Sequence, residues 1–127
     1  MKNICIIGCG HIALSHVRRL SGSVQLYFYS LIKEEADVFN KKSGGNGVFN
    51  SFDDLLNNSD IDGVIICSPP ECHKDQIIKS LEAGKSVLVE KPMCISEEEI
   101  SEIEEVFEKS EKPFLMVSEN YYYKPSL

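Results

Sequence analysis

Gly8 and Gly10 stand where a short apolar run ends and an amphipathic stretch begins. The apolar run, residues 3–7, is rich in β-branched residues and predicts a strand covered on both faces. The amphipathic stretch predicts a helix, and the first amides of a helix that directly follows a strand attract anions. Gly8 would allow a tight turn, Gly10 would let a phosphate group approach, and Ala13 would keep the helix close to the sheet. The pattern Gly-x-Gly-x-x-Ala therefore favours dinucleotide binding.

The residue expected to recognise the adenosine ribose departs from the usual pattern. In NAD-binding proteins an acidic residue about 20 positions further on binds the ribose hydroxyls. Ser30 occupies this region, and the next carboxylate is that of Glu34. Ser30 and Lys33 could receive the 2′-phosphate of NADP, although Ser30 could equally cap a helix. The sequence therefore leans towards NADP over NAD, while S-adenosylmethionine remains a competing ligand for such a turn.

These residues need a scaffold of alternating strands and helices. Helical patterns separate the apolar runs, and the joins between them are short, which implies parallel strands linked by right-handed crossovers. Ser51 and Ser96 are the expected N-caps of two helices, and Gly44 with Gly45 can end a third. The prediction is a doubly wound α/β fold with a six-stranded, mainly parallel sheet and helices on both faces. The strands are expected at residues 3–7, 24–29, 48–49, 63–67, 86–90 and 114–117.

Composition excludes several classes of partner. The chain has 127 residues and a net charge of −7, which argues against binding nucleic acid or an anionic membrane. It has no apolar run long enough to cross a bilayer, and its start lacks the pattern of a signal peptide. Five cysteines without CxxC spacing favour reduced thiols, a cytoplasmic location and no metal site.

Four motifs together resemble one family of enzymes. They are GCGHIA at residues 8–13, CSPPECH at 67–73, VEKP at 89–92 and SENYYYKP at 118–125. In this order, and over essentially the whole chain, they resemble the glucose-fructose oxidoreductase, inositol dehydrogenase and MocA family of NAD(P)-dependent oxidoreductases. The resemblance implies a Rossmann domain at residues 1–118.

The same resemblance implies a larger enzyme. Residues 119–127 would begin the connection to a C-terminal α/β domain that carries much of the substrate site, and the full-length enzyme would be a homo-oligomer. Its reaction would transfer hydride between nicotinamide and a carbinol or carbonyl of a sugar or polyol. The chain by itself is expected to bind the dinucleotide weakly and to turn over no substrate. A noncatalytic dinucleotide-binding or sensing module is the alternative function.

The resemblance also assigns roles to individual residues. Ser68 and Pro69 would line the cofactor, His73 would lie near the nicotinamide, and Glu90 would sit with Lys91 beside the reacting carbon. The bond between Lys91 and Pro92 is commonly cis in the family. The full predicted cofactor-binding set is Gly8, Gly10, His11, Ile12, Ser30, Lys33, Ser68, Pro69, His73, Glu90 and Asn120.

Lys91 is the predicted catalytic residue. In a water-poor pocket, an oxidised nicotinamide ring would repel the ammonium group by roughly 3 kcal/mol at ~5 Å and an effective dielectric of ~20. The repulsion favours the neutral amine, which can exchange a proton with the substrate hydroxyl while hydride moves. The alternative is a solvated lysine before a turn proline. His16, on the first helix, is expected to be a partly exposed polar residue.

Overall fold

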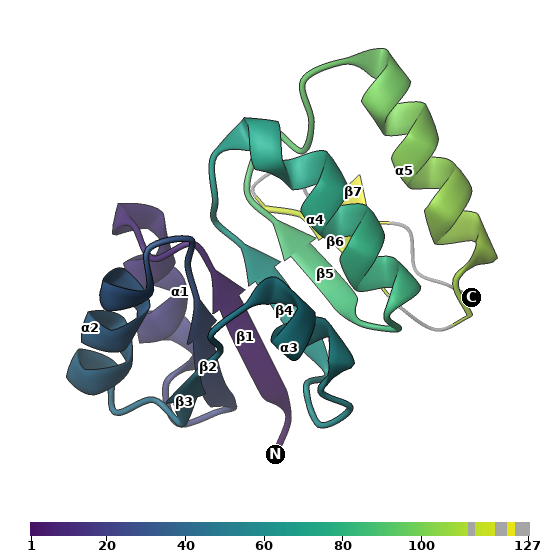
Figure 1. The fold of residues 1–127 in the computed structure, drawn as a ribbon. Helices are drawn as coiled ribbons and strands as arrows, with labels where there is room; N and C mark the ends of the chain where they lie inside the picture. Colours follow the sequence, from purple (N-terminus) through teal and green to yellow (C-terminus); the bar gives the residue numbers. More distant parts are fainter. Residues whose placement is uncertain (112–113, 119–121, 124–127) are drawn as a thin grey trace.

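The computed structural model describes residues 1–111, 114–118 and 122–123. Its single sheet has the strand order β3-β2-β1-β4-β5-β6-β7, and the pairings among the first six strands are all parallel (Figure 1). A seventh strand, which the sequence did not predict, pairs antiparallel with β6. The strands are β1 (Asn3–Ile7), β2 (Gln25–Tyr29), β3 (Gly47–Val48), β4 (Gly63–Ile66), β5 (Ser86–Val89), β6 (Leu115–Val117) and β7 (Tyr122–Tyr123).

Five helices lie on the two faces of this sheet. The helices are α1 (His11–Leu20), α2 (Lys33–Ser43), α3 (Phe52–Asn57), α4 (Pro70–Glu82) and α5 (Glu97–Lys109). Buried side chains of α1 and α2 pack with Ile6 of β1, whereas those of α3, α4 and α5 pack with Cys5 and Ile7. Successive residues of a strand point to opposite faces, so α1 and α2 lie on one face and the other three helices on the second. The doubly wound architecture is therefore confirmed (Figure 1).

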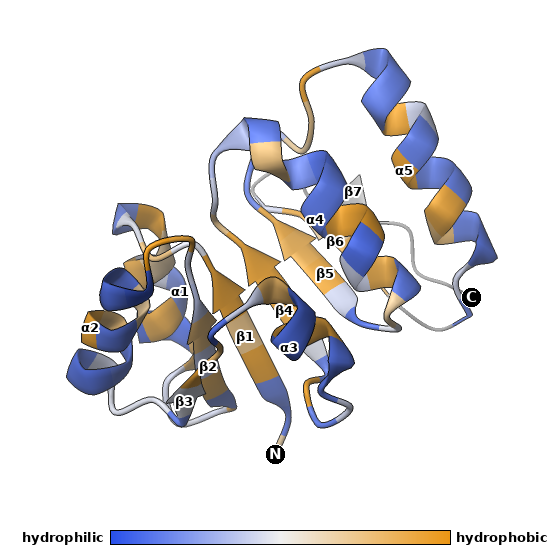
Figure 2. Ribbon diagram, in the orientation of Figure 1, coloured by the Kyte–Doolittle hydropathy of each residue, from blue (hydrophilic) through white to orange (hydrophobic). Residues whose placement is uncertain are grey.

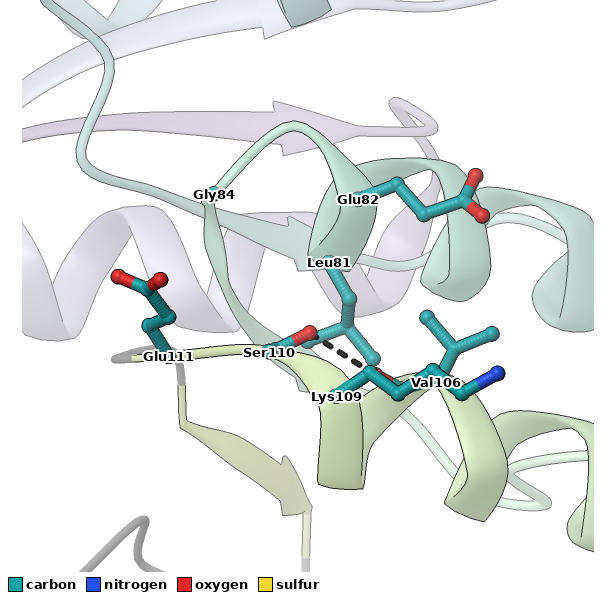
Figure 3. Close-up of a pocket in the computed structure, with 7 residues that line it drawn as sticks. All are labelled: Leu81, Glu82, Gly84, Val106, Lys109, Ser110 and Glu111. Atoms are coloured by element: carbon teal, nitrogen blue, oxygen red, sulfur yellow. Dashed lines mark hydrogen bonds between the residues drawn. The ribbon is translucent and has the colours of Figure 1, made fainter.

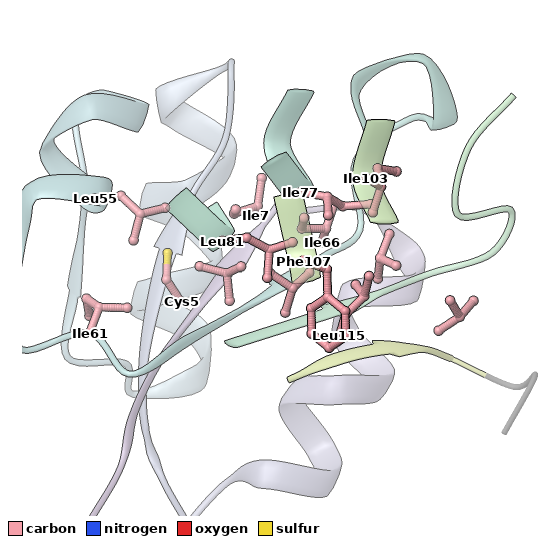
Figure 4. Close-up of a cluster of buried hydrophobic side chains, with 14 of the residues drawn as sticks. Cys5, Ile7, Leu55, Ile61, Ile66, Ile77, Leu81, Ile103, Phe107 and Leu115 are labelled. Atoms are coloured by element: carbon pink, nitrogen blue, oxygen red, sulfur yellow. The ribbon is translucent and has the colours of Figure 1, made fainter. Parts of the chain in front are cut away.

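The larger core lies between the sheet and the second set of helices. Figure 4 shows Leu55 of α3, Ile77 of α4 and Ile103 of α5 converging on the strands, and all three side chains are fully buried. The strands are hydrophobic, while the helices alternate between apolar and polar residues (Figure 2). These are the patterns from which both element types were predicted.

Local signals fix where the helices begin and end. The hydroxyl of Ser51 accepts a hydrogen bond from the amide of Asp54, and the hydroxyl of Ser96 accepts one from the amide of Glu99. The Glu99 side chain also accepts a hydrogen bond from the Ile95 amide at 2.7 Å. Gly44 ends α2 with a φ of 67°, in the left-handed region. The predicted caps at these three helix ends are confirmed.

The carboxyl ends of the parallel strands meet at one edge of the sheet, where ligands bind in folds of this type. The turns after β1, β2, β4 and β5 all lie at this edge. No helix within the described residues is long and apolar enough to span a bilayer.

Candidate functional site

A cavity of about 450 Å³ opens at the carboxyl ends of β1, β2 and β4. Five of the predicted cofactor-binding residues line it: Gly8, Gly10, Ser30, Ser68 and Pro69. The remaining lining residues are Ile7, Cys9, Tyr29, Leu31, Ile32, Glu35, Cys67 and Gln76. The fold therefore brings three separate predicted segments to one concave site.

Gly8 allows two loops to approach each other closely. Its φ is +88°, and a Cβ built at this position would lie 2.8 Å from the backbone nitrogen of Ser68. The Gly8 amide donates a hydrogen bond to the Tyr29 carbonyl at 2.8 Å. Any side chain here would force the turn after β1 away from the turn after β4.

Gly10 serves a different purpose, because the space beside it is open. It is the N-cap of α1, its φ is −106°, and a Cβ built on it would meet no atom within 4 Å. No side chain caps α1, and its first turn contains no acidic residue. The next two residues, His11 and Ile12, are exposed. The helix N-terminus thus presents its amides to an open space that an anionic group can enter.

The turn after β2 holds a carboxylate that the sequence analysis missed. The Ser30 hydroxyl donates a hydrogen bond to Glu35 at 3.3 Å and accepts one from the Ile32 amide. Glu35 lines the cavity, although it lies five residues after Ser30 in the sequence. Only the first turn of α2 brings it back beside the serine. Lys33 is exposed, is not part of the cavity wall, and pairs with Asp37 at 3.3 Å.

The turn after β4 is held in place by α4. The Ser68 hydroxyl donates a hydrogen bond to the side-chain oxygen of Gln76, a buried residue of α4 that also lines the cavity. Pro69 is the N-cap of α4, and Pro70 is its first residue, a position at which proline is favoured. Nothing in the local sequence distinguished Gln76 from an ordinary helix residue.

Two thiols on the cavity wall are neutral at physiological pH. Burial raises the pKa of Cys9 to about 12, with a smaller effect from the nearby Glu35 carboxylate. Burial also raises the pKa of Cys67 to about 12, with smaller effects from Glu90 and Cys9. They therefore add no negative charge to a site proposed to bind an anion. Among the described residues, no group of three or more His, Cys, Asp or Glu could hold a metal ion.

His73 lies behind the cavity wall and connects two loops. Its side chain is almost completely buried, with 1% of the residue exposed. The ring Nε2 is 2.7 Å from the Ser68 carbonyl oxygen, and Nδ1 is 2.8 Å from the Pro92 carbonyl oxygen. His73 thus joins the turn after β4 to the turn after β5.

The segment after β5 carries the predicted catalytic lysine. Lys91 is exposed, and its peptide bond with Pro92 is cis, as the resemblance implied. Glu90 is buried, and its carboxylate lies 2.5 Å from the Nε2 of His16. The expectation that His16 is partly exposed is wrong, because α1 turns this side chain inward against Glu90 and leaves only 6% of the residue exposed. Asn120 lies outside the described residues.

A second cavity, of about 590 Å³, lies at the opposite edge of the sheet (Figure 3). It is formed by the C-terminal ends of α4 and α5 together with Gly84. Leu81 and Val106 supply apolar surface, and the Ser110 hydroxyl donates a hydrogen bond to the Val106 carbonyl. None of the predicted site residues lines this cavity.

Comparisons with known proteins agree with this geometry. Residues 2–119 match the model of an oxidoreductase family with an NAD-binding Rossmann fold. Glucose-6-phosphate 3-dehydrogenase from Bacillus subtilis is 38% identical over 112 residues, which are 86% of this chain and 31% of that protein. Scyllo-inositol dehydrogenase from Lactobacillus casei, solved with NAD(H) and scyllo-inositol, superimposes with a TM-score of 0.82 at 30% identity. The alignment covers 93% of this chain and 36% of that one.

A 3-ketoreductase from Actinomadura kijaniata, solved with NADP and TDP-benzene, is also similar, with a TM-score of 0.83 and 26% identity. That match covers 92% of this chain and 37% of the ketoreductase. The chain therefore spans about a third of the length of these relatives. Both NAD(H) and NADP occur among the related structures.

Proposed function

The chain belongs to the oxidoreductase family with an NAD-binding Rossmann fold, and from this premise we propose that its cavity holds NAD or NADP for hydride transfer. The observation that carries the proposal is the contrast between the two glycines. Gly8 has no room for a side chain, whereas Gly10 borders open space at an uncapped helix N-terminus. The diphosphate of a dinucleotide would occupy that space.

Residues along the carboxyl edge of the sheet would contact both ends of the dinucleotide. The exposed apolar side chains of Leu31 and Ile32 would pack against the flat adenine base. Ser30 would bind the adenosine ribose. Ser68 and Pro69 would direct the other half of the ligand towards Lys91. His11 and Ile12 would contribute backbone amides to the diphosphate.

The bound dinucleotide would accept or donate hydride at its nicotinamide ring. Lys91 would take the proton of the substrate hydroxyl as the carbinol is oxidised, or return it in the reverse direction. Glu90, buried beside His16, would hold the loop that carries Lys91. Relatives that act on inositol and glucose 6-phosphate support a sugar or polyol as the substrate.

We also propose the organisation of the whole enzyme. Residues 1–118 would form the nucleotide-binding domain, and residues 119–127 would begin the connection to a second domain that completes the substrate site. The greater length of the relatives supports this division. The enzyme would be a cytoplasmic homo-oligomer. The five free cysteines suit a reducing compartment.

The preference for NADP rests on Ser30 and Lys33, and Glu35 opposes it. A carboxylate near the ribose repels a 2′-phosphate and accepts hydrogen bonds from a 2′-hydroxyl. Lys33 would have to leave Asp37 to reach the phosphate. Replacing Glu35 with Gln should therefore strengthen NADPH binding relative to NADH by about tenfold, measured as the ratio of the two dissociation constants. An unchanged ratio would show that Glu35 does not contact the adenosine ribose.

Fluorescence titration tests the main proposal. Either NADPH or NADH should bind the chain saturably, and S-adenosylmethionine should not displace it. Displacement by S-adenosylmethionine would instead favour a methyltransferase. Absence of binding by both reduced dinucleotides would contradict the proposed function.

A further inference from the structure

Two buried histidines reach the loop after β5 from opposite faces of the sheet. His16 comes from α1 on one face, and His73 comes from α4 on the other (Figure 1). His16 contacts the Glu90 carboxylate, and His73 contacts the Pro92 carbonyl. Lys91 lies between these two points of attachment.

We propose that His16 and His73 are positioning residues that hold the Glu90–Pro92 segment from both sides and so fix the backbone from which Lys91 projects. The role in catalysis rests on the proposed function, because it presumes that Lys91 acts at the nicotinamide. The attachment itself rests only on the contacts described.

Each ring nitrogen of His73 faces a backbone carbonyl of one of the two turns. A backbone carbonyl oxygen can only accept a hydrogen bond, and both ring nitrogens lie within 2.8 Å of such an oxygen. Whichever ring nitrogen carries a proton donates to the carbonyl oxygen that it faces. In either tautomer the buried ring stands between the two turns and contacts both of them.

The contact between His16 and Glu90 attaches the loop after β5 to α1. Both side chains are buried, so each loses water that must be replaced by a protein partner. The β5 side chains alternate between the two faces, which directs Glu90 towards α1 and away from His73. The glycine turn and α1 are continuous in the chain. His16 therefore couples the element that would bind the diphosphate to the loop that carries Lys91.

Nuclear magnetic resonance on the wild-type chain tests the attachment without any substitution. With ¹⁵N-labelled histidine and ¹³C-labelled carbonyl carbons, a coupling across the hydrogen bond should join a ring nitrogen of His73 to the carbonyl carbon of Ser68 or Pro92. The His16 Nε2 proton should be shifted by its short contact with Glu90. Absence of a coupling from His73 to either carbonyl would overturn the attachment on that side. This result is independent of any dinucleotide, so it also separates failure of the inference from failure of the proposed function.

Variants test the consequence for Lys91. His73→Phe removes both ring nitrogens and should shift the Lys91 amide resonance and weaken dinucleotide binding about tenfold. His73→Asn keeps a donor near the Nδ1 position and should fall between Phe and wild type. His16→Gln retains a donor for Glu90, so its dissociation constant for the dinucleotide should stay within about threefold of the wild-type value. His16→Phe has no donor, so its dissociation constant should rise by more than about threefold.

Lys85→Met is the matched control. Lys85 is also buried and also donates to a backbone carbonyl, that of Asn58, but at the opposite edge of the sheet. This variant should lose stability and keep the Lys91 resonance and dinucleotide affinity of wild type. A His73→Phe chain that folds, with both readouts unchanged, would overturn the proposal. If wild type binds neither dinucleotide, the Lys91 resonance still decides whether the histidines position this loop.

Discussion

At the scale of single residues, two glycines separated by one position have different physical tasks. The Gly8 turn has a positive φ and packs against the backbone of Ser68. Gly10 has an ordinary φ and faces open space. The sequence predicted the tight turn and the open approach, but the close contact between the turns after β1 and β4 required the three-dimensional structure.

Alanine substitutions should separate these tasks. Gly8→Ala should destabilise the fold by about 2–4 kcal/mol, because the left-handed backbone and the contact with Ser68 both oppose a Cβ. Gly10→Ala should change stability by no more than about 0.5 kcal/mol. It should nevertheless weaken dinucleotide binding at least tenfold, because its methyl group occupies the diphosphate space. Urea denaturation and fluorescence titration measure the two effects, and equal stability losses would contradict the assignment.

The thiols of Cys9, which is buried, and Cys67, which is half-buried, should resist alkylation. Thiolate is the reactive form, and a pKa of about 12 leaves roughly one thiol in ten thousand ionised near pH 8. In urea-unfolded chain the pKa returns towards the usual range, so iodoacetamide should react at least a hundredfold faster. Mass spectrometry of the alkylated peptides measures this difference. Comparable rates in folded and unfolded chain would show that the fold does not raise the pKa of these thiols.

Other residues of the site could not be found from the sequence. Glu35 lies beside Ser30 only because α2 starts where it does, and Gln76 reaches Ser68 only after α4 packs on the sheet. His16 was misjudged because its partner, Glu90, is distant in the chain. Short-range patterns predict turns and helix starts, whereas these contacts depend on how separate elements dock.

At the scale of elements, capping and periodicity account for most of the agreement. Six of the strands appear where apolar patterns predicted them, with shifts of at most one residue at their ends. A helix follows the glycine turn, and the caps at Ser51, Gly44 and Ser96 mark helix ends, as predicted. The strand β7 was missed because two tyrosines within a polar segment give no alternating pattern. This strand is defined by its antiparallel pairing with β6 and not by a pattern in its own sequence.

Ser96 should contribute measurably to stability. Its hydroxyl caps α5, and Glu99 completes the cap through the Ile95 amide. Ser96→Ala should therefore lower the free energy of unfolding by about 1 kcal/mol. Ser110→Ala, at the other end of the same helix, serves as the control because its hydroxyl donates to the Val106 carbonyl within α5 and caps no amide among the described residues. Chemical denaturation would refute the cap if the two variants lost the same stability.

At the scale of the whole molecule, one sheet lies between two layers of helices, and the site lies at the carboxyl edge of that sheet. The larger core extends from α3 to α5 and includes side chains of five strands, so the strands that precede the turns of the site are packed in one cluster. Helical alternation allowed the doubly wound topology to be predicted. The strand order and the alignment of the turns follow from crossover handedness and sheet twist.

Ile103 anchors α5 to this core and is fully buried. Ile103→Ala should lower the free energy of unfolding by about 2–5 kcal/mol, because it leaves a cavity between α5 and the sheet. Ile100→Ala, on the same helix but partly exposed, should cost much less. Thermal unfolding of both variants measures the difference, and a larger loss at Ile100 would contradict the packing described.

The most direct test of the account is an amide chemical-shift map of the chain during titration with NADPH and with NADH. At least one dinucleotide should shift the resonances of residues 8–12 and 67–69, and Gly10→Ala should abolish those shifts while the fold persists. Shifts confined to the cavity between the ends of α4 and α5, or no shifts with either dinucleotide, would contradict a diphosphate site at the glycine turn.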